Sequence, residues 1–377
     1  MEFPEYLTKK LTDREELGTL ATFVPNKFEP IYNWFYYKEG FAKNLVFMLL
    51  DMFSPKDDAT ILDPFCGSGT TLLACKERGY ASIGLDLLPV CIFAAATKTA
   101  TYDTEALREQ AKHMLKARYV PQHVNAPPLI KRAFNPHILE DILLFRSHIN
   151  QVRDETQRNF FLLALIQAAM KVTYAFKDGG VIKIRKKPVP SFRQMLRRTI
   201  FHMITDLSHV PLQHVDIQVL QQDARSTDLP DASVDAVITS PPYLNNIDYT
   251  KVYEIEEFIN KRSELPPMRS YIGLKPADEN DTGYDIPLSA VPYIRDMKLF
   301  LTEMKRVTKP GALLAIVVGN GYVEQQIVES DLLIAMMAEE LGFIVEKIYV
   351  LNKRFALEVR SHKKGVLRES IVILKNV

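Results

Sequence analysis

Two short motifs carry residues that could do chemistry. The first, Thr239-Ser240-Pro241-Pro242-Tyr243, closes an apolar run over residues 234–238. Such a run is typical of a buried parallel strand, and catalytic groups are expected at the carboxyl ends of parallel strands. Because the two prolines fix their own φ angles and lack backbone donors, the carbonyls of Ser240 and Pro241 are expected in a rigid, outward-pointing turn. A rigid pair of acceptors followed by an aromatic ring suits the binding of a planar amino group.

The second motif is a glycine loop, Asp63-Pro64-Phe65-Cys66-Gly67-Ser68-Gly69-Thr70. It follows a short apolar strand predicted over 59–62 and leads into a helix predicted over 71–78. Glycine lets a ligand approach the backbone closely. The loop lacks the third glycine of the dinucleotide fingerprint. A nicotinamide-dependent oxidoreductase is therefore disfavoured as the alternative.

Together, the two motifs resemble those of the DNA amino-methyltransferases, which methylate N4 of cytosine or N6 of adenine with S-adenosylmethionine. The resemblance implies an α/β fold with the Rossmann-like, seven-stranded sheet of class I methyltransferases. It also implies that the glycine loop holds the cofactor and that the S-P-P-Y turn, residues 240–243, holds the base. The implied catalytic residues are Ser240, Pro241, Pro242 and Tyr243. The implied cofactor-binding residues are Phe35, Tyr36, Asp63, Phe65, Gly67, Gly69, Thr70, Asp86 and Asp223.

Three parts of this cofactor set lie outside the glycine loop. The aromatic segment 31–37 resembles the amino-terminal motif that packs against the methionine end of the cofactor, although an aromatic cap on the core is an equal alternative for any one ring. Asp86 ends a strand predicted over 81–85, where a carboxylate is placed to accept both ribose hydroxyls. Asp223 resembles the acid that binds the adenine amino group, and a turn aspartate is its alternative.

The strand and helix pattern divides the chain into two parts. Residues 1–119 and 215–377 alternate between strands and helices and form the predicted catalytic domain. The last two predicted strands, over 344–351 and 370–374, resemble the reversed final hairpin of the methyltransferase sheet. Residues 120–214 break the alternation with prolines and three helical patterns. We interpret this helical insertion as the target-recognition region, assisted by a loop-rich connection over 244–292.

Local charge supports this interpretation, although the net charge of +1 does not indicate an extended phosphate-binding surface. The segment 183–198 carries seven lysine or arginine residues and no acidic residue. Its alternative is a solvated face. The predicted nucleic-acid-binding residues are Lys183, Arg185, Lys186, Lys187, Asn245 and Tyr249. A second basic run that includes Lys353, Arg354 and Arg368 fits a solvated face better.

The predicted reaction follows from the chemistry of an exocyclic amino group. Its lone pair is delocalised into the ring, so hydrogen bonds to the Ser240 hydroxyl and the Pro241 carbonyl would localise it toward the methyl donor. Positioning two reactants in line can contribute about 7–11 kcal/mol. The base must leave the duplex at a cost of a few kcal/mol, and stacking on Tyr243 offsets about 1–3 kcal/mol of it.

Serine at the start of the S-P-P-Y turn resembles the members that modify cytosine at N4, so duplex DNA cytosine is the predicted target. Adenine N6 in DNA and an amino group in RNA are the alternatives for the same turn. A non-catalytic nucleic-acid-binding module that kept the fold is the third. The resemblance also implies a prokaryotic restriction-modification context, with a cognate restriction endonuclease that acts separately.

Composition excludes several other classes. No apolar stretch has the length of a membrane span and no secretory pattern begins the sequence. A cytoplasmic location is expected. The three cysteines, Cys66, Cys75 and Cys91, lack the spacing of a zinc site, and no metal site is expected. No cysteine follows Cys91, so the thiolate route to methylation at carbon 5 of cytosine has no nucleophile, whereas methyl transfer to nitrogen needs none.

Overall fold

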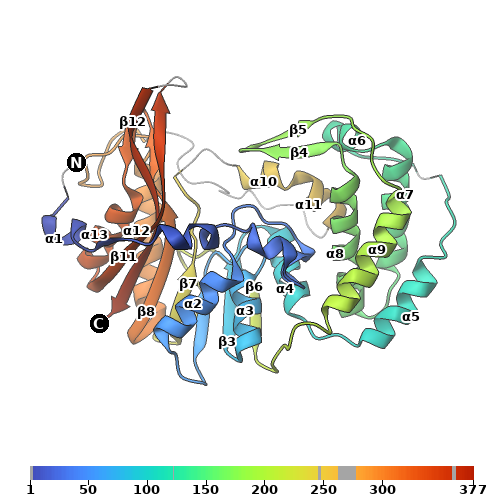
Figure 1. Cartoon of the computed structure of the whole chain (residues 1–377), viewed down its shortest axis with the longest axis horizontal. Coiled ribbons are helices and arrows are strands. Elements are labelled where there is room, and N and C mark those ends of the chain that lie inside the picture. Colours follow the sequence, from blue (N-terminus) through green and yellow to red (C-terminus); the bar gives the residue numbers. More distant parts are fainter. Residues whose placement is uncertain (1–2, 122, 245–247, 262–276, 359–361) are drawn as a thin grey trace.

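A sheet of eight strands is the frame on which both motifs lie in the computed structural model (Figure 1). The structure describes residues 3–121, 123–244, 248–261, 277–358 and 362–377. The strands are, in spatial order, β1 (Leu11–Asp13), β11 (Phe343–Glu358), β12 (His362–Asn376), β8 (Thr308–Gly319), β7 (Val234–Thr239), β2 (Thr60–Asp63), β3 (Ala81–Asp86) and β6 (Ile217–Gln221). Of these, β12 runs antiparallel to both of its neighbours, and the other pairs are parallel.

The predicted class I methyltransferase sheet is confirmed, with one strand more than predicted. Across the sheet, β6, β3, β2, β7, β8, β12 and β11 fill the seven expected positions, including the reversed final hairpin. The eighth strand is β1, whose Leu11 pairs with Ile348 of β11. An edge strand presents unpaired backbone groups, and β1 covers those of β11 at Ile348–Val350. Too short to show an apolar pattern, β1 was not predicted.

Helices cover both faces of the sheet because its buried strands alternate their side chains between the faces. Leu314, Ile316 and Val318 of β8 pack with α12 and α13, whereas Ala315 and Val317 pack with α2 and α3. The helices on these faces are α2 (Lys43–Phe53), α3 (Thr70–Arg78), α12 (Val291–Val307) and α13 (Ser330–Glu340). Helix α4 (Pro89–Thr99) begins after β3 and leads toward the helical half. The short elements of the chain are α1 (Glu5–Thr8), η1 (Glu15–Ala21), η2 (Pro25–Phe28), η3 (Tyr32–Trp34), β9 (Gly321–Val323) and β10 (Gln326–Val328).

The helical half lies beside the sheet half in Figure 1. Its elements are α5 (Thr104–Met114), α6 (Pro128–Ala133), α7 (Pro136–Asn150), α8 (Glu155–Val172), β4 (Ala175–Asp178), β5 (Val181–Ile184), α9 (Phe192–Asp206), α10 (Tyr249–Val252) and α11 (Glu254–Asn260). The insertion is mostly helical, as predicted, but helix α8 stops at Val172 and the chain then turns into the β4–β5 hairpin, which was not predicted. The loop-rich connection over 244–292 also contains α10 and α11, which were not predicted. Helix α5, which precedes residue 120, packs in the same core as α9 of the insertion. The domain boundary between residues 119 and 120 stays a prediction.

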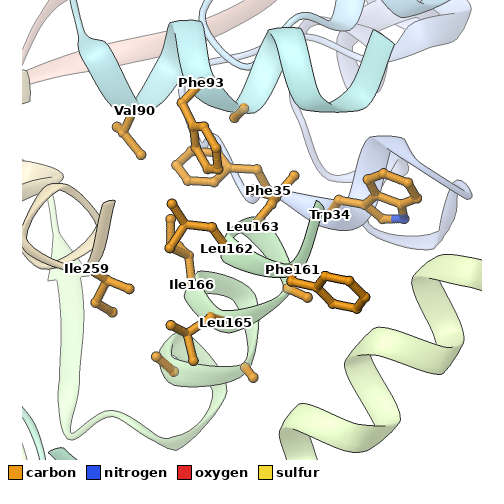
Figure 2. Close-up of a cluster of buried hydrophobic side chains, with 14 of the residues drawn as sticks. Trp34, Phe35, Val90, Phe93, Phe161, Leu162, Leu163, Leu165, Ile166 and Ile259 are labelled. Carbon is orange, nitrogen blue, oxygen red and sulfur yellow. The ribbon is translucent and has the colours of Figure 1, made fainter. Parts of the chain in front are cut away.

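One buried core joins the two halves. Figure 2 shows Val90 and Phe93 of α4 packed near Phe35, near Ile166 of α8 and near Ile259 of α11. All five side chains are at most 3% exposed. Because helix α4 follows β3 directly, this core fixes the helical half relative to the carboxyl ends of the strands. No helix among the described residues is both long and apolar enough to cross a membrane.

Candidate active site

The S-P-P-Y turn lies at the carboxyl end of β7, in the middle of the sheet, as predicted. Tyr243 is fixed at this edge by two neighbouring strands. Its hydroxyl donates to Glu369 Oε1 of β12 at 2.9 Å. A Cβ atom on Gly319 of β8 would lie only 2.8 Å from Cδ2 of the same ring, so glycine is needed there. Burial raises the pKa of Tyr243 well above its usual value, and the phenol stays protonated.

The glycine loop bends where its two glycines have positive φ angles. Gly67, at φ +48°, lies under Tyr37: a Cβ atom on Gly67 would be 2.6 Å from Cε1 of that ring. Gly69, at φ +79°, lies against α4, where a Cβ atom would be 2.8 Å from Cβ of Ala95. L-residues with side chains avoid this backbone region. The first glycine therefore brings an aromatic ring onto the loop, and the second brings α3 against α4.

Asp63 connects the two motifs. Its Oδ2 accepts a hydrogen bond from Thr71 Oγ1 at 2.6 Å, and its Oδ1 accepts one from Thr239 Oγ1 at 2.7 Å. The carboxyl group is buried, and this burial raises its pKa to about 6 despite both hydroxyl bonds. Asp63 thus ties the start of the glycine loop and of α3 to the last residue of β7, directly before Ser240.

Asp86 ends β3 beside the loop. Its Oδ2 accepts from the Gly67 backbone N–H at 2.9 Å, and its Oδ1 accepts from the Leu88 N–H at 2.8 Å. Each carboxylate oxygen has two lone pairs, so both oxygens keep acceptor capacity for a ligand. Burial raises the pKa of Asp86 to about 6.

Asp223 follows β6 and is paired. Arg225 Nη2 donates to its Oδ2 at 2.6 Å, and Arg225 Nη1 donates to Asp296 Oδ1 at 2.7 Å. The hydrogen bond from Arg225 holds the pKa of Asp223 below its usual value. This charged chain of three side chains connects the end of β6 to α12.

These groups face one cavity of about 490 Å³, which is a typical size for a small-ligand site. Of the predicted site residues, those that line it are Ser240, Pro241, Pro242, Tyr243, Asp63, Phe65, Gly67, Thr70, Asp86, Asp223 and Tyr249. The wall of this first cavity therefore joins the S-P-P-Y turn, the glycine loop and both strand-end acids.

The remaining predicted residues lie elsewhere. Phe35 and Tyr36 line a separate second cavity, and Phe35 is buried with its ring stacked at 6.0 Å on Tyr253. Gly69 packs on Ala95 and does not line the first cavity. The basic side chains Lys183, Arg185, Lys186 and Lys187 are exposed on and after β5 and line neither cavity. Asn245 lies outside the described residues.

Sequence reasoning missed several residues of the first cavity. Tyr37 and Phe41, rather than Phe35 and Tyr36, line it from the aromatic segment and from the residues just before α2. Adjacent residues of this irregular segment face different cavities, and the sequence has no period there that would show which rings face which cavity. Arg354 and Arg368 of the terminal hairpin also line the cavity. The solvated-face interpretation is wrong for Arg368, which pairs with Asp331 at 2.8 Å and has a side chain that is 14% exposed.

Lys98 is a further residue that no motif signals. It is fully buried in α4, and its Nζ donates to the Ser68 carbonyl at 2.9 Å and lies 3.2 Å from Ser68 Oγ. Burial lowers the pKa of this ammonium group to about 7. Lys98 supports the glycine loop from behind, inside an otherwise apolar helix.

Cys66 lines the first cavity but is a poor nucleophile. Burial raises the pKa of its thiol well above the usual value, with Asp86 and Asp63 contributing in the same direction. Because the thiolate is the nucleophilic form, this cysteine does not supply the covalent route that carbon methylation needs.

The residues of the first cavity fit S-adenosylmethionine. Asp86 offers carboxylate oxygens for ribose hydroxyls, at the end of the strand beside the glycine loop. The rings of Tyr37, Phe41 and Phe65 offer aromatic faces to an adenine ring or a sulfonium cation. The bend at Gly67 brings the loop backbone to the cavity wall. When bound, the cofactor would supply an electrophilic methyl group on sulfur.

Comparison with known proteins agrees with this geometry. A family model described as DNA methylase, for N6 and N4 methyltransferases, matches residues 9–95 and 234–374, more than half of the chain. The two matched parts contain both motifs, and the helical insertion falls in the unmatched interval.

Two relatives align with most of this chain, including the helical insertion. The Type II methyltransferase M.BsoBI of Geobacillus stearothermophilus is 28% identical, over 94% of this chain and 87% of its own. The Type II methyltransferase M.AvaI of Nostoc sp. is 24% identical, over 94% of this chain and 88% of its own. A solved geranyl diphosphate methyltransferase with S-adenosylmethionine is 9% identical, covers 89% of this chain and 85% of its own, and has a TM-score of 0.36. That likeness is too loose to carry an argument about substrate.

Proposed function

Because this chain belongs to the N6/N4 DNA methylase family and is an S-adenosylmethionine-dependent DNA methyltransferase, we propose that it methylates the 4-amino group of cytosine in duplex DNA. The observation that carries the proposal is that the S-P-P-Y turn, Gly67 and Asp86 line one cavity. A base held by the turn would therefore lie in the same space as the methyl donor. The serine at the first position of the turn supports cytosine over adenine.

In this proposal, the Ser240 hydroxyl oxygen and the Pro241 carbonyl accept the two hydrogens of the base amino group. These hydrogen bonds draw its lone pair out of the ring and direct it along the line of transfer. Tyr243 stacks on the base, and its bond to Glu369 holds the ring in place at 2.9 Å. Stacking of this kind is worth about 1–3 kcal/mol per base, comparable with the few kcal/mol that base extrusion costs.

Other residues of the cavity wall would position the cofactor. Asp86 would accept the ribose hydroxyls, and the rings of Tyr37 and Phe65 would pack against the nucleoside. Lys98 and Asp63 do not contact the reactants in this proposal. Instead they hold the glycine loop through Ser68 and Thr71.

Recognition of the DNA sequence is proposed for the helical insertion, residues 120–214, through the exposed Lys183, Arg185, Lys186 and Lys187. The β4–β5 hairpin that leads into them extends from the helical half toward the sheet half, above α10 and α11 in the view (Figure 1). Tyr249 of α10 lines the first cavity and would shape the base pocket. Both relatives are named Type II methyltransferases, and a Type II restriction-modification role is proposed for this chain. A cytoplasmic location in a prokaryote and a separate endonuclease are part of the same proposal.

The test is transfer of a tritiated methyl group from S-adenosylmethionine to unmethylated genomic DNA, followed by identification of the labelled base. We expect labelled 4-methylcytosine, and its loss in Ser240→Ala with unchanged S-adenosylhomocysteine affinity. Labelled 6-methyladenine would show that the target base is adenine and not cytosine. Label in structured RNA but not in DNA would contradict the choice of polymer.

A further inference from the structure

A second cavity of about 430 Å³ lies where the aromatic segment meets the helical half, and the proposed reaction does not use it. Its wall combines the segment 33–38, helix α8, the β4–β5 hairpin and helix α11. The lining residues are Asn33, Phe35, Tyr36, Lys38, Ile166, Gln167, Met170, Lys171, Ala175, Phe176, Lys177, Ile182, Ile255 and Glu256. Lys38 also lines the first cavity, so the two cavities are neighbours.

Glu256 puts a carboxylate with unused acceptor capacity into this wall. The residue is 3% exposed, and its Oε1 accepts a hydrogen bond from Lys177 Nζ at 2.8 Å. Its Oε2 is also buried but has no hydrogen-bond partner among the described residues. Each carboxylate oxygen has two lone pairs, so the bond from Lys177 to Oε1 leaves Glu256 with acceptor capacity.

Lys177 places a donor beside that acceptor. Its Nζ lies 3.3 Å from the centroid of the Tyr253 ring, which fixes the ammonium group above an aromatic face. An ammonium group has three donors, and the bond to Glu256 uses one. A donor next to an acceptor complements the Watson–Crick edge of a nucleobase, which presents adjacent acceptor and donor groups. Proteins that take a base out of the helix read that edge in this way.

The rest of the wall suits a flat, mostly apolar ring. Phe35, Ile166, Met170, Ile182 and Ile255 line it, and no acidic residue other than Glu256 does so. At the rim, Tyr36 is 44% exposed and Phe176 is 46% exposed, although both carry aromatic rings. Exposed aromatic faces are the surfaces on which unpaired bases stack. The rim also carries Lys38 and Lys171, which favour a polyanion.

We propose that the second cavity binds another unpaired nucleobase of the DNA substrate, through its Watson–Crick edge, while the target base occupies the first cavity. This inference rests on the proposed function. Extrusion of the target leaves its partner base with a free Watson–Crick edge, so the reaction itself produces a suitable ligand. The DNA chain passes nearby in this arrangement, because Ile182 lines the cavity and Lys183 begins the basic run that follows it.

Two substitutions test the site in different ways. Met170→Trp fills the cavity from α8, and Glu256→Gln removes the charged acceptor at constant size. Met336→Trp on α13 and Glu303→Gln on α12 are matched controls, since neither position lines the second cavity or lies in the proposed recognition region. Binding is measured by fluorescence anisotropy with a duplex that carries the methylation site found in the genomic assay. Calorimetry with S-adenosylhomocysteine reports on the first cavity and on folding.

We expect both cavity variants to bind the duplex about tenfold more weakly than the controls, as for the loss of one stacked base. Their S-adenosylhomocysteine affinity should stay at the wild-type value. The same assay is repeated with duplexes that each lack one base. At one position other than the target, removal of the base should weaken wild-type binding by a similar factor but should not weaken binding by Met170→Trp any further. That non-additivity is the sign that the base and the cavity act as a pair.

Three results separate the outcomes. If the variants bind the duplex as tightly as the controls while wild type methylates it, the second site is wrong and the proposed function stands. If wild type transfers no methyl group to DNA, the proposed function fails, and this inference fails with it. If a deoxynucleoside monophosphate raises the melting temperature of wild type but not of Met170→Trp, and duplex affinity is unchanged in the variants, the cavity binds a free nucleotide and the DNA assignment is overturned.

Discussion

The edge of the sheet that lines the first cavity and the basic segment of the helical half, residues 183–198, are built in opposite ways. Around the first cavity, Asp63 bonds to two hydroxyls, Lys98 bonds to Ser68, and Tyr243 bonds to Glu369. Lys186 and Lys187 are exposed, and among the described contacts neither forms an ion pair. The difference matches two physical tasks. Transfer of a methyl group needs reactants fixed in line, whereas attraction of a polyanion needs charge but little geometry.

The glycines of the two regions give the largest expected contrast. In Gly69→Ala, the new Cβ meets Ala95 at a φ of +79°, and we expect the free energy of unfolding to fall by about 3 kcal/mol. Gly179→Ala, in the β4–β5 turn at a φ of +59°, has nothing within 4 Å and should lose only about 1 kcal/mol. Chemical denaturation measures both. Equal losses would show that the two regions are packed alike.

Asp86 tests the first cavity through its affinity for S-adenosylhomocysteine. Asp86→Asn should weaken S-adenosylhomocysteine binding about tenfold, because a hydrogen bond to a charged group is worth about 1.5–3 kcal/mol. The pKa of Asp86 is raised to about 6, so its carboxylate is charged above that pH and protonated below it. Wild-type affinity should therefore fall as the pH drops from 7 to 5, and calorimetry across this range measures it.

Asp86→Asn is also the control for the pH dependence of S-adenosylhomocysteine affinity. Burial also raises the pKa of Asp63 to about 6, but its hydrogen bonds hold the protein scaffold. In Asp86→Asn, the affinity should no longer change between pH 7 and 5. A profile that keeps its wild-type shape would assign the titration to Asp63.

Charge reversal tests the exposed region. Lys186→Glu with Lys187→Glu should weaken duplex binding about tenfold and reduce the slope of log affinity against log salt by about 2, since each phosphate contact contributes roughly 0.9. S-adenosylhomocysteine binding should not change. Lys56→Glu, in the exposed loop before β2, is the control. An unaltered salt slope in the double variant would remove the basic segment from the DNA interface.

The smallest effect concerns the position of Tyr243. Tyr243→Phe keeps the ring but loses the 2.9 Å bond to Glu369, which costs about 1 kcal/mol, and kcat/KM should fall about fivefold. Glu369→Gln keeps an acceptor oxygen and should reduce kcat/KM less. A larger loss in Glu369→Gln than in Tyr243→Phe would mean that Glu369 acts by more than holding the ring.

The sequence indicated the S-P-P-Y turn and the glycine loop because local residue types fix their backbone conformations. Two prolines after an apolar strand, and two glycines before a helix, specify their own backbone conformations. The class I sheet and its reversed final hairpin followed from the resemblance of the motifs, and both are confirmed. Residues such as Lys98 carried no local signal, because a lysine within an apolar helix looks like a solvated side chain until the fold buries it.

By itself, therefore, the sequence determined the sheet, the family resemblance and the two loops that meet at its carboxyl edge, since short-range backbone preferences and strand periodicity encode them. Only the tertiary structure decided which rings face the first cavity, where Tyr37 and Phe41 replace Phe35 and Tyr36. It also decided that the terminal hairpin brings Glu369 to Tyr243 and that Glu256 lies in a second cavity. These contacts join residues far apart in the chain, and such side-chain directions depend on the packing of the whole molecule.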